Sequence, residues 1–159
     1  MAPCSGLTGT SASAGTRTPY KNHLDLFFWA GEGRSRERPG FFFRLPSDRL
    51  ILGAGIHSFD TRMLEAYRAS VLDDERGTAL EVAVSEAAVA GATLEGVGYR
   101  WVPAGLDPAH SRAGLLLHNA LHSSFDEPVP PSLSTSSFVD HCLDRFQPLA
   151  PLLAWVAGL

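Results

Sequence analysis

The sequence predicts an α+β domain in which an antiparallel sheet is built around a β-hairpin and helices pack on one face. Two runs of apolar, aromatic or branched residues, 41–45 and 50–56, are separated by Pro46-Ser47-Asp48, and these three residue types favour a turn. The later segments carry single apolar stripes at helical spacing, which is typical of helices that bury one face against a sheet. A chain of 159 residues is the size of one domain.

The predicted sheet begins before the hairpin. From Tyr20 the pattern changes, and residues 23–28 alternate in a way that is typical of a strand with one buried face. Residues 31–40 are polar and rich in arginine, so they are predicted to form a loop. Gly53 and Gly55 in the second hairpin strand indicate a bulge, the favoured interpretation, or a close approach of another segment.

Two helices are predicted after the hairpin. Asp60 is suited to cap the first, whose apolar residues 63, 64, 67 and 71 share one face. The second is predicted to begin at Thr78, where Glu81 completes a capping-box spacing, and to end at Gly91.

The region after Gly91 is predicted to contain a short strand at 99–102, a helix from Asp107-Pro108 to about Leu117, and a strand over 119–125.

A terminal helix is predicted after a proline-rich loop, with Ser137 at its start. We expect this helix to bury Leu143 and Phe146. Pro148 and Pro151 are expected to kink or break it.

Composition limits the classes of partner. A net charge of −4 gives no long-range attraction for nucleic acid or an anionic membrane. No apolar run reaches the length of a membrane span, and residues 1–16 lack the pattern of a signal peptide. Cys4 and Cys142 do not make a disulfide framework. We therefore expect a cytoplasmic protein with no nucleic-acid or membrane partner.

Motifs for metals, cofactors and catalysis are weak. His118 and His122 have the spacing of zinc ligands on a helix, but Asn119 stands where the protease motif has Glu, and a strand is expected there. The segment 53–55 lacks the third glycine of a phosphate-binding loop, and no G-x-S-x-G elbow is present. We expect no cofactor and no metal ion, and no catalytic residue is assigned.

Four polar side chains form the candidate binding cluster, namely Tyr20, Lys21, His23 and Arg44. A phenol, an ammonium and an imidazole at the start of a strand are suited to bind an anion or to move a proton. A strand edge that is kept polar to prevent aggregation explains the first three equally well. The first hypothesis is therefore a protein, whether or not an enzyme, that binds a small molecule or a small anion.

The second hypothesis is a non-catalytic module that binds another protein. Its basis is the aromatic density of residues 27–29 and 41–43, which matters if some of these rings are exposed. Core packing is the competing explanation, because aromatic residues of strands usually fill cores. Convergence of the polar cluster on one concave pocket favours the ligand hypothesis, whereas a flat exposed aromatic face favours the partner hypothesis.

Four short motifs occur in a characteristic order: TPYKNH at 18–23, GFFFRL at 40–45, LGAG at 52–55 and VPAGLD at 102–107. In order and spacing they resemble the uncharacterised bacterial family catalogued as domain of unknown function 2461, over residues 18–159. Ala104 stands where that family usually has Lys. The resemblance implies a longer α+β protein, with helices before the part seen here, and it implies no activity.

Residues 1–17 are expected to lie outside the domain formed by residues 18–159. Residues 1–16 contain twelve Gly, Ala, Ser or Thr and no charge, a composition that favours disorder. The family's hallmark, Arg-Asp-x-Arg-Phe, is absent, since its positions read Gly9, Thr10, Ala12 and Ser13. Codons for residues 8–17, read in a shifted frame, permit the hallmark residues in order. An out-of-frame tail would make the chain a truncated product with little native function, and the nucleotide sequence of the locus decides this.

Overall fold

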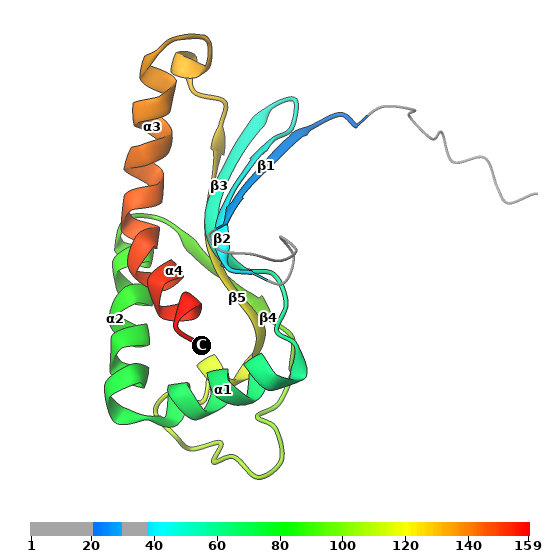
Figure 1. Cartoon of the computed structure of the whole chain (residues 1–159), viewed down its shortest axis with the longest axis vertical. Coiled ribbons are helices and arrows are strands. Elements are labelled where there is room, and N and C mark those ends of the chain that lie inside the picture. Colours follow the sequence, from blue (N-terminus) through cyan, green and yellow to red (C-terminus); the bar gives the residue numbers. More distant parts are fainter. Residues whose placement is uncertain (1–20, 30–37) are drawn as a thin grey trace, which may run out of the picture.

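The computed structural model describes residues 21–29 and 38–159 of the chain (Figure 1). The predicted tail, Tyr20 and most of the arginine-rich loop lie outside these residues.

Within the described ranges, the strands form one antiparallel sheet in the order β1-β2-β3-β5-β4. The strands are β1 (Leu24–Trp29), β2 (Gly40–Leu45), β3 (Arg49–Ile56), β4 (Thr93–Val97) and β5 (His118–Pro128). The helices are α1 (Thr61–Leu72), α2 (Asp74–Val89), α3 (Ser137–Phe146) and α4 (Ala150–Ala157). Helices α2, α3 and α4 lie on one side of the sheet, and α1 crosses its lower end (Figure 1). The predicted α+β architecture is confirmed.

The predicted hairpin of β2 and β3 forms, with residues 46–48 in its turn. The bulge favoured at Gly53 and Gly55 is wrong, because β3 pairs in continuous register with both of its neighbours. The alternative, a close approach, is what the structure contains. A Cβ at Gly53 would collide with the ring of Phe42. Gly55 has a φ of 138° and a backbone that leaves no room for a Cβ beside Leu121, so both positions require glycine.

Helix α1 begins where it is predicted, since the Asp60 carboxylate accepts a hydrogen bond of 2.7 Å from the amide of Met63. Helix α2 begins before the predicted Thr78, because Asp73 already caps it by accepting from the amide of Arg76. The Thr78 hydroxyl instead donates to the carbonyl of Asp74.

The connection between α2 and β5 differs most from the sequence prediction. The strand here is β4, at Thr93–Val97, and residues 99–102 form no strand. The helix predicted from Asp107 is also wrong. The Asp107 side chain accepts from the amide of Ala109, a local turn that competes with helix, and only one 3-10 turn, Leu115–Leu117, follows.

Arg112 ties this connection to the helices. Its guanidinium is buried and donates to the carbonyl oxygens of Val71 (3.2 Å) and Asp73 (3.1 Å), at the junction of α1 and α2. It also donates to the carboxylate of Glu81 (3.0 Å) and the hydroxyl of Thr78 (3.1 Å). This one cation therefore satisfies the Val71 carbonyl, which the end of α1 leaves unpaired, and it adds a second donor to the Asp73 carbonyl, which already accepts from the amide of Gly77.

The terminal helix is broken at Pro148 as predicted, by a 3-10 turn between α3 and α4. Phe146 is half-buried and its ring lies 4.8 Å from that of Phe41, centroid to centroid. The expectation that Leu143 is buried is wrong, since this side chain is 59% exposed. Helix α3 contacts the sheet through the stripe of Phe138, Cys142 and Phe146, which leaves Leu143 on the outer side.

Strand β1 does not have the buried face that its alternation predicts. Leu24, Leu26 and Phe28 are exposed, although the register places Leu26 beside the buried Phe43. The reason is that β1 lies at the edge of the sheet, whereas α3 and α4 lie over β3.

The main core lies between the helices and β3 and β5. Its fully buried side chains come from every layer of the molecule and include Ile56, Tyr67, Val71, Leu80, Leu116, Leu121, Leu152 and Val156. No helix in the described part of the chain has both the length and the apolar character needed to cross a membrane. The core fixes the sheet from one side and leaves its other face free to carry polar groups.

Candidate functional site

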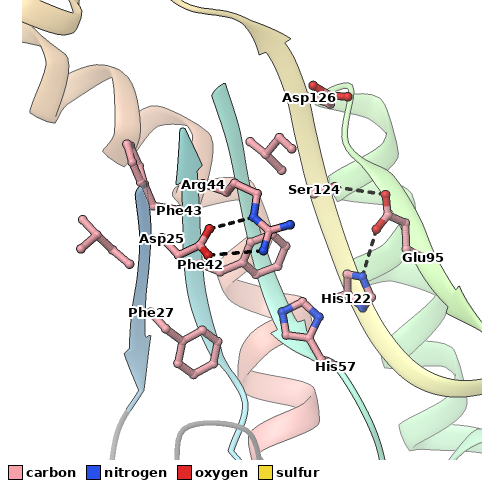
Figure 2. A pocket seen from close by; sticks show the side chains of 12 residues that line it. Asp25, Phe27, Phe42, Phe43, Arg44, His57, Glu95, His122, Ser124 and Asp126 are labelled. Carbon is pink, nitrogen blue, oxygen red and sulfur yellow. Dashed lines mark hydrogen bonds and ion pairs between the residues drawn. The ribbon is translucent and has the colours of Figure 1, made fainter. Parts of the chain in front are cut away.

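The sheet face opposite the helices, here called the open face, carries the candidate site. Successive residues of a strand point to opposite faces, so the register brings Asp25 beside Arg44 and Phe27 beside Phe42 on this side. Together with residues of β3, β4 and β5 they surround a hollow of about 440 Å³, the open-face hollow (Figure 2). The residues that line it are Asp25, Leu26, Phe27, Phe42, Phe43, Arg44, Ile51, His57, Glu95, His122, Ser124 and Asp126.

Three rings form the floor of the open-face hollow. The ring centroid of Phe42 lies 5.1 Å from that of His57 and 6.0 Å from that of His122, and the two imidazoles are 4.8 Å apart. Gly53 and Gly55 make this possible, because they pair with Phe42 on one side and with His122 on the other. A central strand without side chains at these two positions lets rings from its neighbours lie across it.

Glu95 on β4 links two residues of β5. Its carboxylate lies 3.0 Å from Nε2 of His122 and accepts from the Ser124 hydroxyl at 3.4 Å (Figure 2). The Nδ1 atom of His122 is buried and, among the described residues, has no hydrogen-bond partner. Because Ser124 donates to a carboxylate and not to an imidazole, this group does not have the geometry of an activated serine nucleophile.

Asp25 collects the cationic residues that the sequence singled out. Its carboxylate accepts from Nε of Arg44 at 2.7 Å, and it lies 3.1 Å from Nε2 of His23 and 3.9 Å from Nζ of Lys21. The structure therefore brings Lys21, His23 and Arg44 together, whereas Tyr20 lies outside the described residues. The Arg44 hydrogen bond holds the pKa of Asp25 below its usual value, and burial opposes this effect.

His57 lies directly after β3 at the lower end of the open-face hollow (Figure 2). Burial lowers the pKa of this imidazole, and repulsion from His122 and Arg44 lowers it further, while Glu95 acts in the opposite direction. His57 is therefore neutral at pH 7. Within residues 21–29 and 38–159, no side-chain hydrogen bond engages its ring.

Sequence reasoning missed Asp25, His57 and Glu95. Asp25 could have been identified from the sequence, because it lies on the same face of the predicted strand as His23. His57 follows a correctly predicted strand, but nothing in the sequence shows that the chain keeps this ring over the sheet. Glu95 could not be placed in the site from the sequence, because β4 itself was not predicted.

A zinc pair at His118 and His122 does not fit the structure. Both residues lie on β5 and not on a helix, and His118 is buried with Nδ1 at 3.2 Å from the carbonyl oxygen of Leu115. Among the described residues, no group of three or more His, Cys, Asp or Glu side chains is placed to hold a metal ion.

A second hollow, the edge hollow, lies on the helix side, between the edge of the sheet and the junction of α3 and α4. It has a volume of about 550 Å³ and is lined by Phe28, Phe41, Leu143, Phe146, Gln147 and Ala150. With the exposed Leu24 and Leu26 of β1 it forms a continuous apolar edge, so part of the aromatic density noted in the sequence is exposed.

Comparison with known proteins gives one match. The model of a family described as conserved hypothetical protein (DUF2461) matches residues 15–155. Neither the curated proteins nor the solved structures contain a match to this chain.

Proposed function

Because the chain belongs to the DUF2461 family of conserved hypothetical proteins, a description that implies no activity, we propose its function from the open face: the open-face hollow binds a small organic molecule. The observation that carries the proposal is the convergence of Phe42, His57, His122 and Arg44 on one concave surface. Apolar rings with a few oriented polar groups are the usual lining of a ligand site.

The role of the predicted cluster follows from Asp25. Lys21 and Arg44 together carry two positive charges against the single carboxylate of Asp25, and both contact it. Around the Asp25 carboxylate the cations thus outnumber the anion, which supports binding of a small anionic group beside it, as the sequence predicts. His23 adds a third contact to the same carboxylate. We propose no catalytic role for any of these residues.

The experiment that tests the proposal is amide NMR mapping with a library of small aromatic, heterocyclic and carboxylate fragments. We expect the perturbed amides to cluster around the open-face hollow, in β2, β3 and β5. Ile51→Phe places a ring in the hollow and is expected to abolish binding. Val82→Phe is the matched control, since Val82 is exposed on α2. The proposal is wrong if no fragment perturbs these amides, or if Ile51→Phe binds as the unaltered chain does.

A second candidate function is association with a protein chain, and the edge hollow favours it. Strand β1 pairs only with β2 among the described strands, and it presents Leu26 and Phe28 on its helix side. A free strand edge is a template for another strand. A second copy of this chain is the favoured occupant, because antiparallel pairing of β1 about Leu26 apposes Leu24 of each copy to Phe28 of the other.

A cytoplasmic location is part of the proposal. Among the described residues Cys142 has no disulfide partner, and a reducing compartment keeps thiols unpaired.

A further inference from the structure

The class of ligand follows from which groups in the open-face hollow still have hydrogen-bonding capacity. Each carboxylate that lines the hollow already has a donor: Asp25 accepts from Arg44, Glu95 contacts His122, and Asp126 accepts from Arg49. The acceptors of the lining are thus largely used within the protein.

The donors are not used to the same extent. A guanidinium has five N–H groups, and Arg44 directs Nε and Nη2 at Asp25. Its side chain remains 53% exposed, and Figure 2 shows it directed at the Asp25 carboxylate. His57 makes no side-chain hydrogen bond within the described ranges. The complementary ligand group is therefore an acceptor, and a planar carboxylate matches a guanidinium best.

The floor of the hollow selects the rest of the ligand. Phe27 and Phe42 oppose each other across β1 and β2, and the Phe42 ring lies over Gly53, where a side chain would collide with it. A fixed, partly exposed ring surface favours a ligand ring through offset or edge contacts. An anion without a ring makes no such contact with this surface.

We propose that the ligand of the open-face hollow is a small aromatic carboxylate, with its ring on Phe42 and Phe27 and its carboxylate accepting hydrogen bonds from Arg44 and His57. This inference rests on the proposed function and names its ligand. Asp25 then acts as an internal competitor, because its carboxylate occupies two donors of Arg44 in the free protein.

Binding of such a ligand is coupled to protonation of His57. The charged and titratable groups around this imidazole are Arg44 on β2, His122 on β5, Glu95 on β4 and, beyond Arg44, Asp25 on β1. A ligand carboxylate beside His57 adds a negative charge that favours the protonated ring. Because the pKa of His57 in the free protein is lowered from 6.5, affinity is highest at acid pH, where the ring takes up a proton, and it declines as the pH rises from there to the higher pKa of the ring in the complex.

Amide NMR titrations of the full chain with benzoate, benzamide and acetate test the inference. Benzoate has both features, benzamide lacks the charge and acetate lacks the ring. We expect benzoate to bind about tenfold more tightly than either of the others, the value of one charge-assisted hydrogen bond or one buried ring contact. Its affinity is expected to be higher at pH 6 than at pH 8.

Two variants give opposite effects that misfolding does not produce. Arg44→Gln is expected to weaken the binding of benzoate. Asp25→Asn frees the guanidinium and is expected to tighten the binding of benzoate about two- to fivefold, the value of an exposed ion pair. Arg62→Gln removes an exposed charge from α1 and serves as the control with no expected effect. Equal binding of benzamide, equal binding of acetate, or weaker binding by Asp25→Asn overturns the inference. If no fragment of any class perturbs the open-face amides, the proposed function itself is wrong.

Discussion

At the scale of single residues, two imidazoles are buried or half-buried and stay neutral at pH 7. Burial lowers the pKa of both His57 and His118. Neither belongs to the polar cluster that the sequence singled out. Both affect the free energy of unfolding because the folded chain holds them without a proton. The unfolded chain binds protons at these positions more readily than the folded chain does, so folding and protonation oppose each other.

Stability is accordingly expected to fall as the pH decreases from 7.5 to 5. Below the ordinary histidine value of 6.5 the unfolded state takes up protons that the folded state, with its lowered pKa at His57 and His118, does not yet bind. The free energy of unfolding, measured by urea denaturation across this range, should therefore decline. The double variant His57→Gln, His118→Gln should show a smaller decline, and an unchanged slope would refute this assignment.

At the scale of elements, the buried guanidinium of Arg112 replaces a longer helix or a tight turn as the means of fixing the segment between α2 and β5. Although Arg112 follows α2 in the sequence, it donates to the carbonyl oxygens of Val71 and Asp73, which precede α2. Gly77 belongs to the same arrangement, since a Cβ there would meet the Arg112 guanidinium at 2.5 Å. The absence of a side chain in α2 thus admits the cation.

Arg112→Met is expected to destabilise the chain by about 3 kcal/mol, because it retains the aliphatic volume, leaves the Val71 carbonyl without a donor and removes the charge paired with Glu81. Urea denaturation measures the change. Arg62→Met on the exposed side of α1 is the control, with an expected change within about 0.5 kcal/mol. A loss of less than about 0.5 kcal/mol for Arg112→Met would show that water satisfies the carbonyl group of Val71.

The elements differ in how far the sequence predicts them. The β2 to β3 hairpin and the start of α1 follow from local signals, a Pro-Ser-Asp turn and the Asp60 cap, and both are confirmed. Strand β4 was missed because its five residues, with Gly96 among them, carry a weak strand pattern and are held by pairing with β5. The site residues divide in the same way. Arg44 lies on a strand that local signals predict, whereas the position of Glu95 depends on the long-range pairing of β4 with β5.

At the scale of the whole molecule, polar chemistry and apolar surface lie on opposite sides of the same sheet. The open-face hollow carries the ionisable groups, and the edge hollow carries Phe28 and Leu143 on the helix side. Ligand binding and association through β1 therefore use opposite faces of the sheet, and the two surfaces meet at β1, where Asp25 and Leu26 both line the open-face hollow.

Sedimentation velocity at increasing protein concentration tests the association. We expect a monomer–dimer equilibrium for the unaltered chain and a monomer for Leu26→Lys, because a charge at the centre of the paired strands blocks edge pairing. Val89→Lys is the control, since Val89 is 88% exposed at the end of α2, and it should dimerise normally. A chain that stays monomeric at every concentration would reject the second candidate function.

The strand order has a consequence for the chain during its synthesis. Strand β3 pairs along its whole length with β5, from Arg49 opposite Pro128 to Ile56 opposite Leu121. The centre of the sheet therefore cannot close until the ribosome has released residues far beyond the hairpin. Until then, the nascent β2 to β3 hairpin exposes an open, apolar strand edge, the kind of surface that aggregates or recruits chaperones. The helices that pack over β3 are α3 and α4, and both follow β5 in the chain, so neither covers this strand in the interval.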